Sequence, residues 1–140
     1  MPLQVLAVDD SQCWRMYIME TLQVESDLRV VAQAMDGFEA VQKASQLRPA
    51  VIVMDLSLPG VNGLDATRRI LMVSPNSKVL FFSQHAAWDL VVAAFEAGGS
   101  GYVLKSDAAF DLVPRIRAIL ENRQYVSRSL NRGPSYFHKP

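Results

Sequence analysis

Short apolar runs alternate with longer stretches of mixed polarity along the chain. The apolar runs are rich in Val and Leu and lie at about 3–8, 29–34, 51–54, 78–82 and 101–104. Unbroken runs of this length are typical of strands buried on both faces, as parallel strands are. The stretches between them have the length of helices and lie at about 11–24, 37–48, 63–72, 86–97 and 108–121. This alternation predicts an α/β fold with a parallel sheet covered by helices on both faces.

Polar side chains follow four of the predicted strands, at the point where each strand ends. They are Asp9 with Asp10, then Asp55, Ser83 and Lys105. Because parallel strands all point the same way, residues just past their carboxyl ends gather along one edge of the sheet, where such folds bind ligands. The sequence therefore predicts one site with three carboxylates, a hydroxyl and an ammonium group.

Three neighbouring carboxylates need a positive partner, because like charges raise one another's pKa. A set of oxygen ligands suits a hard cation such as Mg²⁺. We expect the carboxylates of Asp10 and Asp55, a water held by Asp9 and the backbone carbonyl of Ser57 to bind it. The simpler alternative is a solvated acidic loop.

Asp55 is the candidate nucleophile, because a carboxylate beside Mg²⁺ can attack phosphorus and form an aspartyl phosphate. Phosphoryl transfer depends mainly on positioning and on neutralising the phosphoryl oxygens. Lys105, as a point charge, and the Ser83 hydroxyl are suited to this task.

Composition indicates a single domain. The chain has 140 residues, half of them hydrophobic, and equal numbers of acidic and basic residues, 14 of each. This balance gives no bias toward nucleic acid or an anionic membrane, and no apolar run approaches the roughly 18 residues of a membrane span. The one cysteine, Cys13, excludes an intramolecular disulfide and is interpreted as a small buried hydrophobe in a reducing compartment.

The motifs together resemble the receiver domain of two-component response regulators, over residues 3 to about 125. The resemblance rests on Val-Asp9-Asp10-Ser, Val-Met-Asp55-Leu-Ser-Leu-Pro59-Gly-Val-Asn-Gly63, Phe-Phe-Ser83 and Gly-Tyr-Val-Leu-Lys105. It implies a doubly wound (βα)5 fold of the flavodoxin/CheY type with strand order 2-1-3-4-5. It also implies Mg²⁺ as cofactor and a histidine kinase or a phosphotransfer protein as phosphoryl donor.

The same resemblance assigns roles to the residues. Asp9, Asp10, Asp55 and the Ser57 carbonyl hold the metal, and Asp55 is the phosphoacceptor. When Ser83 turns toward a phosphoryl oxygen, the ring of Tyr102 rotates inward and changes the surface formed by 86–97, 101–104 and 108–121. Trp88 and Phe95 are candidates to meet a partner there. A receiver catalyses its own phosphorylation and dephosphorylation but is not a turnover enzyme.

The end of the predicted domain resembles the receivers that precede a LuxR/NarL-type helix-turn-helix domain, through Gly-Gly-Ser-Gly-Tyr-Val-Leu-Lys105 and the segment from Leu112 to Ser127. That output domain is absent from this sequence. We expect a receiver domain over 1–125 and a basic tail or truncated linker over 126–140, in a stand-alone receiver or a fragment of a longer regulator. The expected location is cytoplasmic, with no membrane contact. A homodimer is an option, and no DNA contact is expected from this chain alone unless an output domain is missing.

Three residues near Asp55 are predicted to modulate the phosphorylation pocket. Gln84 stands where receivers often have a small residue, so its side chain is expected to crowd the pocket. His85 either orients or blocks the water that hydrolyses the phosphorylated Asp55, or is only a solvent-facing residue at a helix start. Ser57 completes this set.

Two rival functions share features with this sequence. A haloacid-dehalogenase-like phosphatase needs a second Asp two residues after the nucleophile, and Ser57 stands there. The alternative function is a degenerate receiver that acts as a phosphorylation-independent protein-interaction module, against which the intact set of Asp9, Asp10, Asp55, Ser83 and Lys105 argues. For Trp14, near the predicted site, we expect partial burial.

Overall fold

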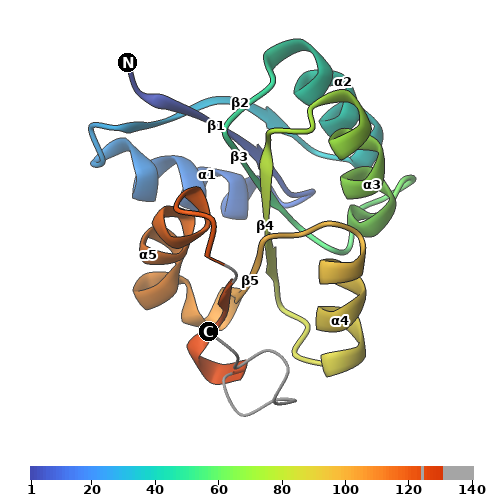
Figure 1. Ribbon diagram of the computed structural model, residues 1–140. Coiled ribbons are helices and arrows are strands. Elements are labelled where there is room, and N and C mark those ends of the chain that lie inside the picture. Colours follow the sequence, from blue (N-terminus) through green and yellow to red (C-terminus); the bar gives the residue numbers. More distant parts are fainter. Residues whose placement is uncertain (124, 131–140) are drawn as a thin grey trace.

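A parallel sheet forms the centre of the molecule, and helices cover both of its faces (Figure 1). The computed structural model describes residues 1–123 and 125–130. The strands are β1 (Leu3–Val8), β2 (Leu28–Ala34), β3 (Val51–Met54), β4 (Lys78–Ser83), β5 (Gly101–Leu104) and β6 (Tyr125–Val126). The helices are α1 (Gln12–Gln23), α2 (Gly37–Leu47), α3 (Gly63–Val73), α4 (Trp88–Glu96) and α5 (Ala108–Leu120), with the 3₁₀ turns η1 (Lys105–Asp107) and η2 (Arg128–Leu130).

The strand order is β2-β1-β3-β4-β5-β6, and every neighbouring pair is parallel. The predicted doubly wound fold with order 2-1-3-4-5 is therefore confirmed, with β6 added at the β5 edge. The chain runs outward from β1 to β2 and then returns past β1 to β3. The two connecting helices, α1 and α2, therefore lie on opposite faces of the sheet. Such a reversal opens a crevice at the carboxyl ends of the central strands.

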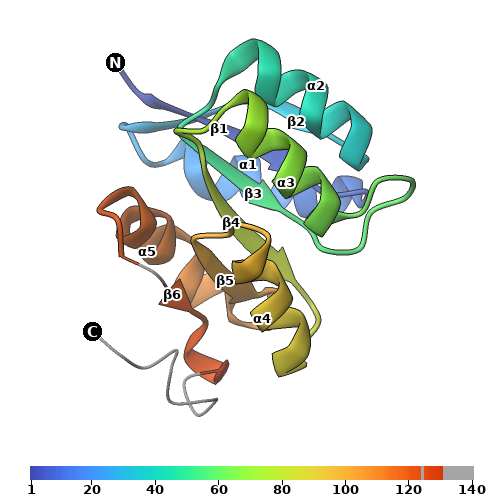
Figure 2. The ribbon, with the colours of Figure 1, turned by 45° about the vertical axis from the view of Figure 1, so that its right-hand side comes forward.

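Alternate residues of each strand feed two separate cores, because successive side chains of a strand point to opposite faces. In β4, Val79 and Phe81 pack toward α2, α3 and α4, whereas Leu80 and Phe82 pack toward α1 and α5. Figure 2 shows α1 and α5 on one side of the sheet and the other three helices opposite. All four of these side chains are at most 1% exposed. Close packing on both faces therefore fixes the position of the strand and of its carboxyl end.

Polar caps begin three of the helices on the carboxyl-end side of the sheet. The side chains of Ser11, Asp36 and Asn62 accept hydrogen bonds from backbone N–H groups in the first turns of α1, α2 and α3. Such caps satisfy N–H groups that have no partner inside the helix. The cap at Ser11 also starts α1 directly beside Asp9 and Asp10, so that both carboxylates lie between a strand end and a helix start.

Residues 125–130 continue the packed structure beyond α5. β6 pairs with β5, and Val126, Ser127 and Leu130 are at most 5% exposed. The sequence pattern does not distinguish this segment from the expected tail over 126–140. The domain boundary near 125 stays a prediction, and residues 131–140 lie outside the described part of the chain.

Two local expectations can be compared directly with the structure. Cys13 is exposed, so its interpretation as a buried hydrophobe is wrong: α1 turns Ile18 and Leu22 toward the sheet and leaves Cys13 on the outer side. Trp14 is partly buried, as expected, with its ring 5.4 Å from that of Phe82. Within the described ranges, the chain forms no helix that is both long and apolar enough to cross a membrane.

Candidate functional site

The carboxyl ends of β1, β3 and β5 meet at a hollow of about 290 Å³. It is lined by Asp9, Asp10, Ser11, Trp14, Asp55, Ser57, Gln84 and Lys105. The polar residues that follow these three strands thus lie together, as the parallel sheet requires. Ser83, at the end of β4, is fully buried next to this edge.

The three carboxylates form a compact cluster. One oxygen from each of Asp9, Asp10 and Asp55 lies within 4.8 Å of the others. Asp9 is fully buried and Asp10 is exposed, so the cluster spans from the interior to solvent. Asp9 is held in place because its Oδ1 accepts a 2.9 Å hydrogen bond from the Ser11 N–H, and its backbone carbonyl accepts one from Arg15.

Lys105 supplies the positive charge among these groups. Its Nζ lies 2.8 Å from Oδ2 of Asp9 and 3.7 Å from Oδ2 of Asp55. The ammonium also lies 5.0 Å from the centre of the Trp14 ring, a cation–π contact. Its side chain is only 9% exposed, so the charge acts in a region of low solvent screening.

The pKa of Asp55 is raised from 3.8 to about 6, first by burial, then by the negative charge of Asp9 and, to a smaller extent, by that of Asp10. Lys105 and a hydrogen bond from the Ser57 backbone oppose this shift and lower the pKa. The net shift is upward, so Lys105 and this hydrogen bond do not fully offset burial and the two neighbouring negative charges. A further cation at the cluster would favour the ionised form of Asp55.

The donor set fits a hard divalent cation. It consists of oxygen atoms, carries excess negative charge and opens to solvent at Asp10, which matches the preference of Mg²⁺ for a few carboxylates and several waters. Asp9, Asp10 and Asp55 are thus the residues able to hold it. The backbone carbonyl of Ser57 stays a predicted ligand.

His85 connects the polar groups on the β4 side of the site. Its backbone N–H donates to the Ser83 hydroxyl at 3.1 Å, and its backbone carbonyl accepts a 2.7 Å hydrogen bond from the Tyr102 hydroxyl. Its ring nitrogen Nε2 lies 2.9 Å from the Ser57 hydroxyl. The sequence predicted each of these residues near the pocket, but His85 as their common contact was not predicted.

Tyr102 is completely buried, and its ring stacks on Phe81 with the ring centres 6.3 Å apart. Burial raises the pKa of its hydroxyl above the ordinary value of 10.0. The ring therefore occupies an inward position in this structure. Trp88 and Phe95 of α4 are partly buried against the same core, so they offer a partner only part of their surface.

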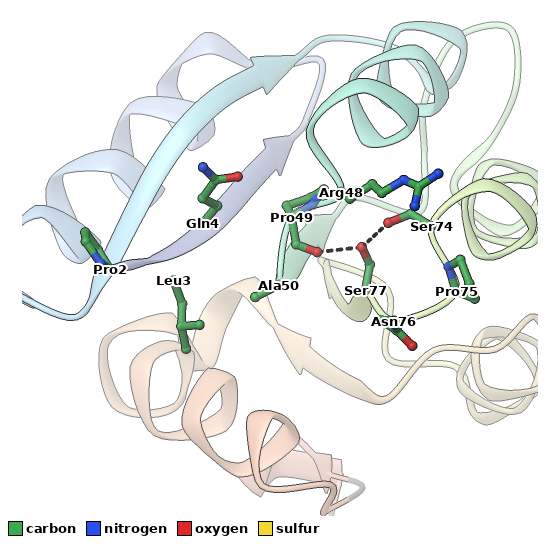
Figure 3. Close-up of a pocket in the computed structure, with 10 residues that line it drawn as sticks. All are labelled: Pro2, Leu3, Gln4, Arg48, Pro49, Ala50, Ser74, Pro75, Asn76 and Ser77. Carbon is green, nitrogen blue, oxygen red and sulfur yellow. Dashed lines mark hydrogen bonds between the residues drawn. The ribbon is translucent and has the colours of Figure 1, made fainter.

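A larger hollow, of about 520 Å³, lies at the other end of the strands, near the starts of β1, β3 and β4 (Figure 3). Its lining includes Ser77, whose hydroxyl donates to the Pro49 carbonyl at 2.5 Å and lies 2.7 Å from the Ser74 hydroxyl. These bonds fasten the β3 and β4 starts together. None of the predicted site residues lines this hollow, so size does not identify the candidate site.

Comparison with known proteins agrees with this geometry. Residues 5–130 match the family described as response regulator receiver domain. The chain is 34% identical over 124 residues to the transcriptional regulatory protein DegU of Brevibacillus brevis, covering 89% of this chain and 52% of that protein. It is 34% identical over 122 residues to the response regulator protein VraR of Staphylococcus saprophyticus, covering 87% and 58%.

Solved structures give the same result. A two-component response regulator of the LuxR family from Aurantimonas sp. SI85-9A1 superposes with a TM-score of 0.88 at 35% identity, covering 93% of each chain. The response regulator domain of Thermotoga maritima CheB gives a TM-score of 0.81 at 30% identity, covering 86% of this chain and 98% of that one. The chain spans only 52% to 58% of the length of the two regulators named above.

Proposed function

The chain belongs to the family of response regulator receiver domains, with relatives of the LuxR/NarL type, and we propose that Asp55 is its phosphoacceptor. The observation that carries this proposal is the position of Asp55 beside Asp9, Asp10 and Lys105 at the carboxyl edge of the sheet. The resulting function is a switch controlled by phosphorylation.

In the proposed reaction an Asp55 carboxylate oxygen attacks the phosphorus of the donor. The new O–P bond replaces the P–N bond of a phosphohistidine, and the imidazole leaves with the electron pair and takes a proton from solvent. Lys105 neutralises charge on the phosphoryl oxygens, since its Nζ already lies 3.7 Å from Oδ2 of Asp55. The Ser83 hydroxyl donates to a phosphoryl oxygen after it turns.

Asp9, Asp10 and Asp55, with the Ser57 carbonyl, are proposed to hold Mg²⁺. When bound, this ion supplies positive charge that lowers the repulsion between carboxylate and phosphoryl oxygens. Burial, and then the charge of Asp9, raises the pKa of Asp55, and a bound cation would stabilise its ionised form against both effects.

The phosphorylated form is proposed to signal through Ser83 and Tyr102. The His85 backbone joins them, because it donates to Ser83 and accepts from Tyr102. Rearrangement of these bonds changes the surface formed by 86–97, 101–104 and 108–121, where α4, β5 and α5 lie. This is a local change of contacts that biases one of two states.

Ser57, Gln84 and His85 are proposed to set the lifetime of the phosphorylated form. The contact of 2.9 Å between the Ser57 hydroxyl and His85 Nε2 supports a role in limiting the approach of water. Gln84 is exposed and lines the hollow, which supports its proposed role of crowding the pocket.

The proposed phosphoryl donor is a histidine kinase or a phosphotransfer protein, and a homodimer is a further partner option. We place the chain in the cytoplasm, where response regulators act. It is proposed to catalyse its own phosphorylation and dephosphorylation without being a turnover enzyme. DNA contact is not proposed for this chain alone.

The test is intact-mass analysis after incubation with Mg²⁺ and acetyl phosphate, alongside Asp55→Asn. We expect one added phosphoryl group on the native chain and none on the variant. Asp65→Asn is the matched control, because Asp65 is an exposed carboxylate on α3, and it should label as the native chain does. No labelling by acetyl phosphate or by a phosphorylated phosphotransfer protein would favour the phosphorylation-independent interaction module. Equal labelling of Asp55→Asn would instead overturn the assignment of Asp55 as the phosphoacceptor.

A further inference from the structure

The segment from Val126 to Leu130 covers the outer edge of β5. β6 lies beside β5 (Figure 2), with Val126 as the register partner of Tyr102. The Ser127 N–H donates a 2.6 Å hydrogen bond to the Tyr102 carbonyl. Val126 and Leu130 are each 5% exposed and belong to the same core as the Tyr102 ring.

Two serines fasten this segment to the start of α5. The hydroxyl of Ser127, which is fully buried, donates to carboxylate oxygens of Asp107 and of Asp111, the latter at 3.2 Å. Ser129 donates to Asp107 through its hydroxyl at 2.8 Å and its N–H at 3.2 Å. Hydrogen bonds to charged groups are stronger than neutral ones, so they fix the segment more firmly than two strand residues alone would.

The same segment confines the ring of Tyr102. Register partners on neighbouring parallel strands project to the same face, so Val126 and Phe81 flank Tyr102 on its two sides. Phe81 stacks on the ring, and Leu130 packs in the same core. A rotation of Tyr102 outward over the β5 edge therefore enters the space that Val126 and Leu130 occupy.

We infer that residues 126–130 are a latch that holds Tyr102 inward and links the C-terminal segment of this chain to the phosphorylation site. The link to Asp55 rests on the proposed function, whereas the hold on Tyr102 does not. Since coupling between two sites is reciprocal, any event that favours the inward ring also favours the docked segment. A partner strand that pairs with the β5 edge must first displace the latch.

The experiment is ¹⁹F NMR of the full chain labelled with 3-fluorotyrosine, with Tyr102→Phe to assign the Tyr102 signal. The latch is weakened by Leu130→Ala, and independently by Ser127→Ala, which keeps the apolar contacts. Leu22→Ala is the control, because Leu22 is also buried but lies in the core on the other face. Both latch variants should shift the Tyr102 signal toward a solvent-exposed value, while the control should not.

Labelling by acetyl phosphate is the second readout. If the inward ring is the form that accepts the phosphoryl group, the latch variants should label about fivefold more slowly than the native chain, the lower end of typical coupling between sites. A native rate together with a shifted Tyr102 signal would remove the link to Asp55 and keep the latch.

An unchanged Tyr102 signal in both latch variants, or an equal change in Leu22→Ala, would overturn the latch itself. If the native chain accepts no phosphoryl group, the proposed function fails, and the fluorine signals alone decide whether the latch exists. The two proposals therefore fail in different measurements.

Discussion

The α-carbon of Gly63 lies directly against the backbone of Asp55, so that a Cβ atom built on Gly63 would be 2.3 Å from the Asp55 carbonyl oxygen. Gly63 also donates its N–H to the Leu56 carbonyl at 3.0 Å. The first residue of α3 is thus in contact with the loop that carries the candidate nucleophile. The position of Asp55 depends on the absence of a side chain there.

We predict that Gly63→Ala slows phosphorylation of Asp55 by acetyl phosphate. The added methyl group must push the Asp55 backbone aside, and a displacement of about 1 Å at a reacting group can cost about 100-fold in rate. Gly60→Ala is the control, because Gly60 has a φ of 70° but no atom within 4 Å of its built Cβ. It should lose about 1 kcal/mol of stability through backbone strain and keep most of its rate. Equal rates in the two variants would contradict the prediction.

Lys105→Met is predicted to destabilise the fold in a manner that depends on pH. Removing the ammonium leaves the buried Asp9 and its neighbour Asp55 without their cation, which we expect to cost roughly 3 kcal/mol of unfolding free energy at neutral pH. The loss should shrink near pH 5, because Asp55, with its pKa raised to about 6 by burial and then by Asp9, is then mostly protonated and no longer repels Asp9. Urea unfolding measures both values, and Lys78→Met is the control, because Lys78 begins β4 at the end of the sheet away from the site. A loss independent of pH would show that the charge of Lys105 is not the cause.

Asp55→Asn is predicted to be more stable than the native chain at pH 8 in the absence of Mg²⁺. Burial, and then the charge of Asp9, raises the pKa of Asp55 to about 6, whereas the unfolded carboxyl titrates near its ordinary value of 3.8. Between these values the native state binds more protons than the unfolded state, so the free energy of unfolding falls as pH rises from about 4 to about 6 and stays lower above that.

The expected gain in the variant is roughly 1 to 2 kcal/mol at pH 8, after allowance for solvent screening, and it should almost vanish near pH 4. Urea unfolding across this range, with a chelator present, gives the comparison. Added Mg²⁺ should stabilise the native chain more than the variant, because the ion compensates the Asp55 charge. A gain that is the same at every pH would argue against a perturbed carboxyl.

His85→Ala and Ser57→Ala are each predicted to shorten the lifetime of phosphorylated Asp55. Their side chains are joined at 2.9 Å beside the site, and a net hydrogen bond of about 1 kcal/mol corresponds to roughly a fivefold change in rate. Since each change breaks the same contact, the double variant should decay no faster than either single one. Decay of the phosphorylated mass, followed with time, measures all four proteins. Additive effects would mean that the two side chains act separately.

The sheet and its cores could be predicted because the sequence pattern and the packing have the same cause. Runs such as Val51–Met54 contain only apolar residues, and they are fully buried in the structure. The carboxyl-edge site followed from the parallel arrangement, because Asp9, Asp55 and Lys105 each come directly after such a run. Neither inference needed a long-range contact to be known in advance.

The contacts of the C-terminal segment and of His85 could not be predicted in this way. β6 is two residues long, too short for any periodicity, and its hold depends on Ser127 reaching two carboxylates of another element. The link between His85 and Tyr102 depends on a backbone carbonyl, which every residue carries and no sequence pattern marks. The exposure of Cys13 depended on the rotation of α1 about its axis, which the apolar positions Ile18 and Leu22 set.

The ion pair between Asp9 and Lys105 also bears on how the chain assembles during its synthesis. Asp9 leaves the ribosome with the first strand, whereas Lys105 follows the last strand of the predicted five. Until that lysine arrives, the nascent sheet brings carboxylates together with no ammonium between them, and their repulsion opposes closure of this edge. The edge that is proposed to receive a signal in the finished protein is thus expected to close late in folding.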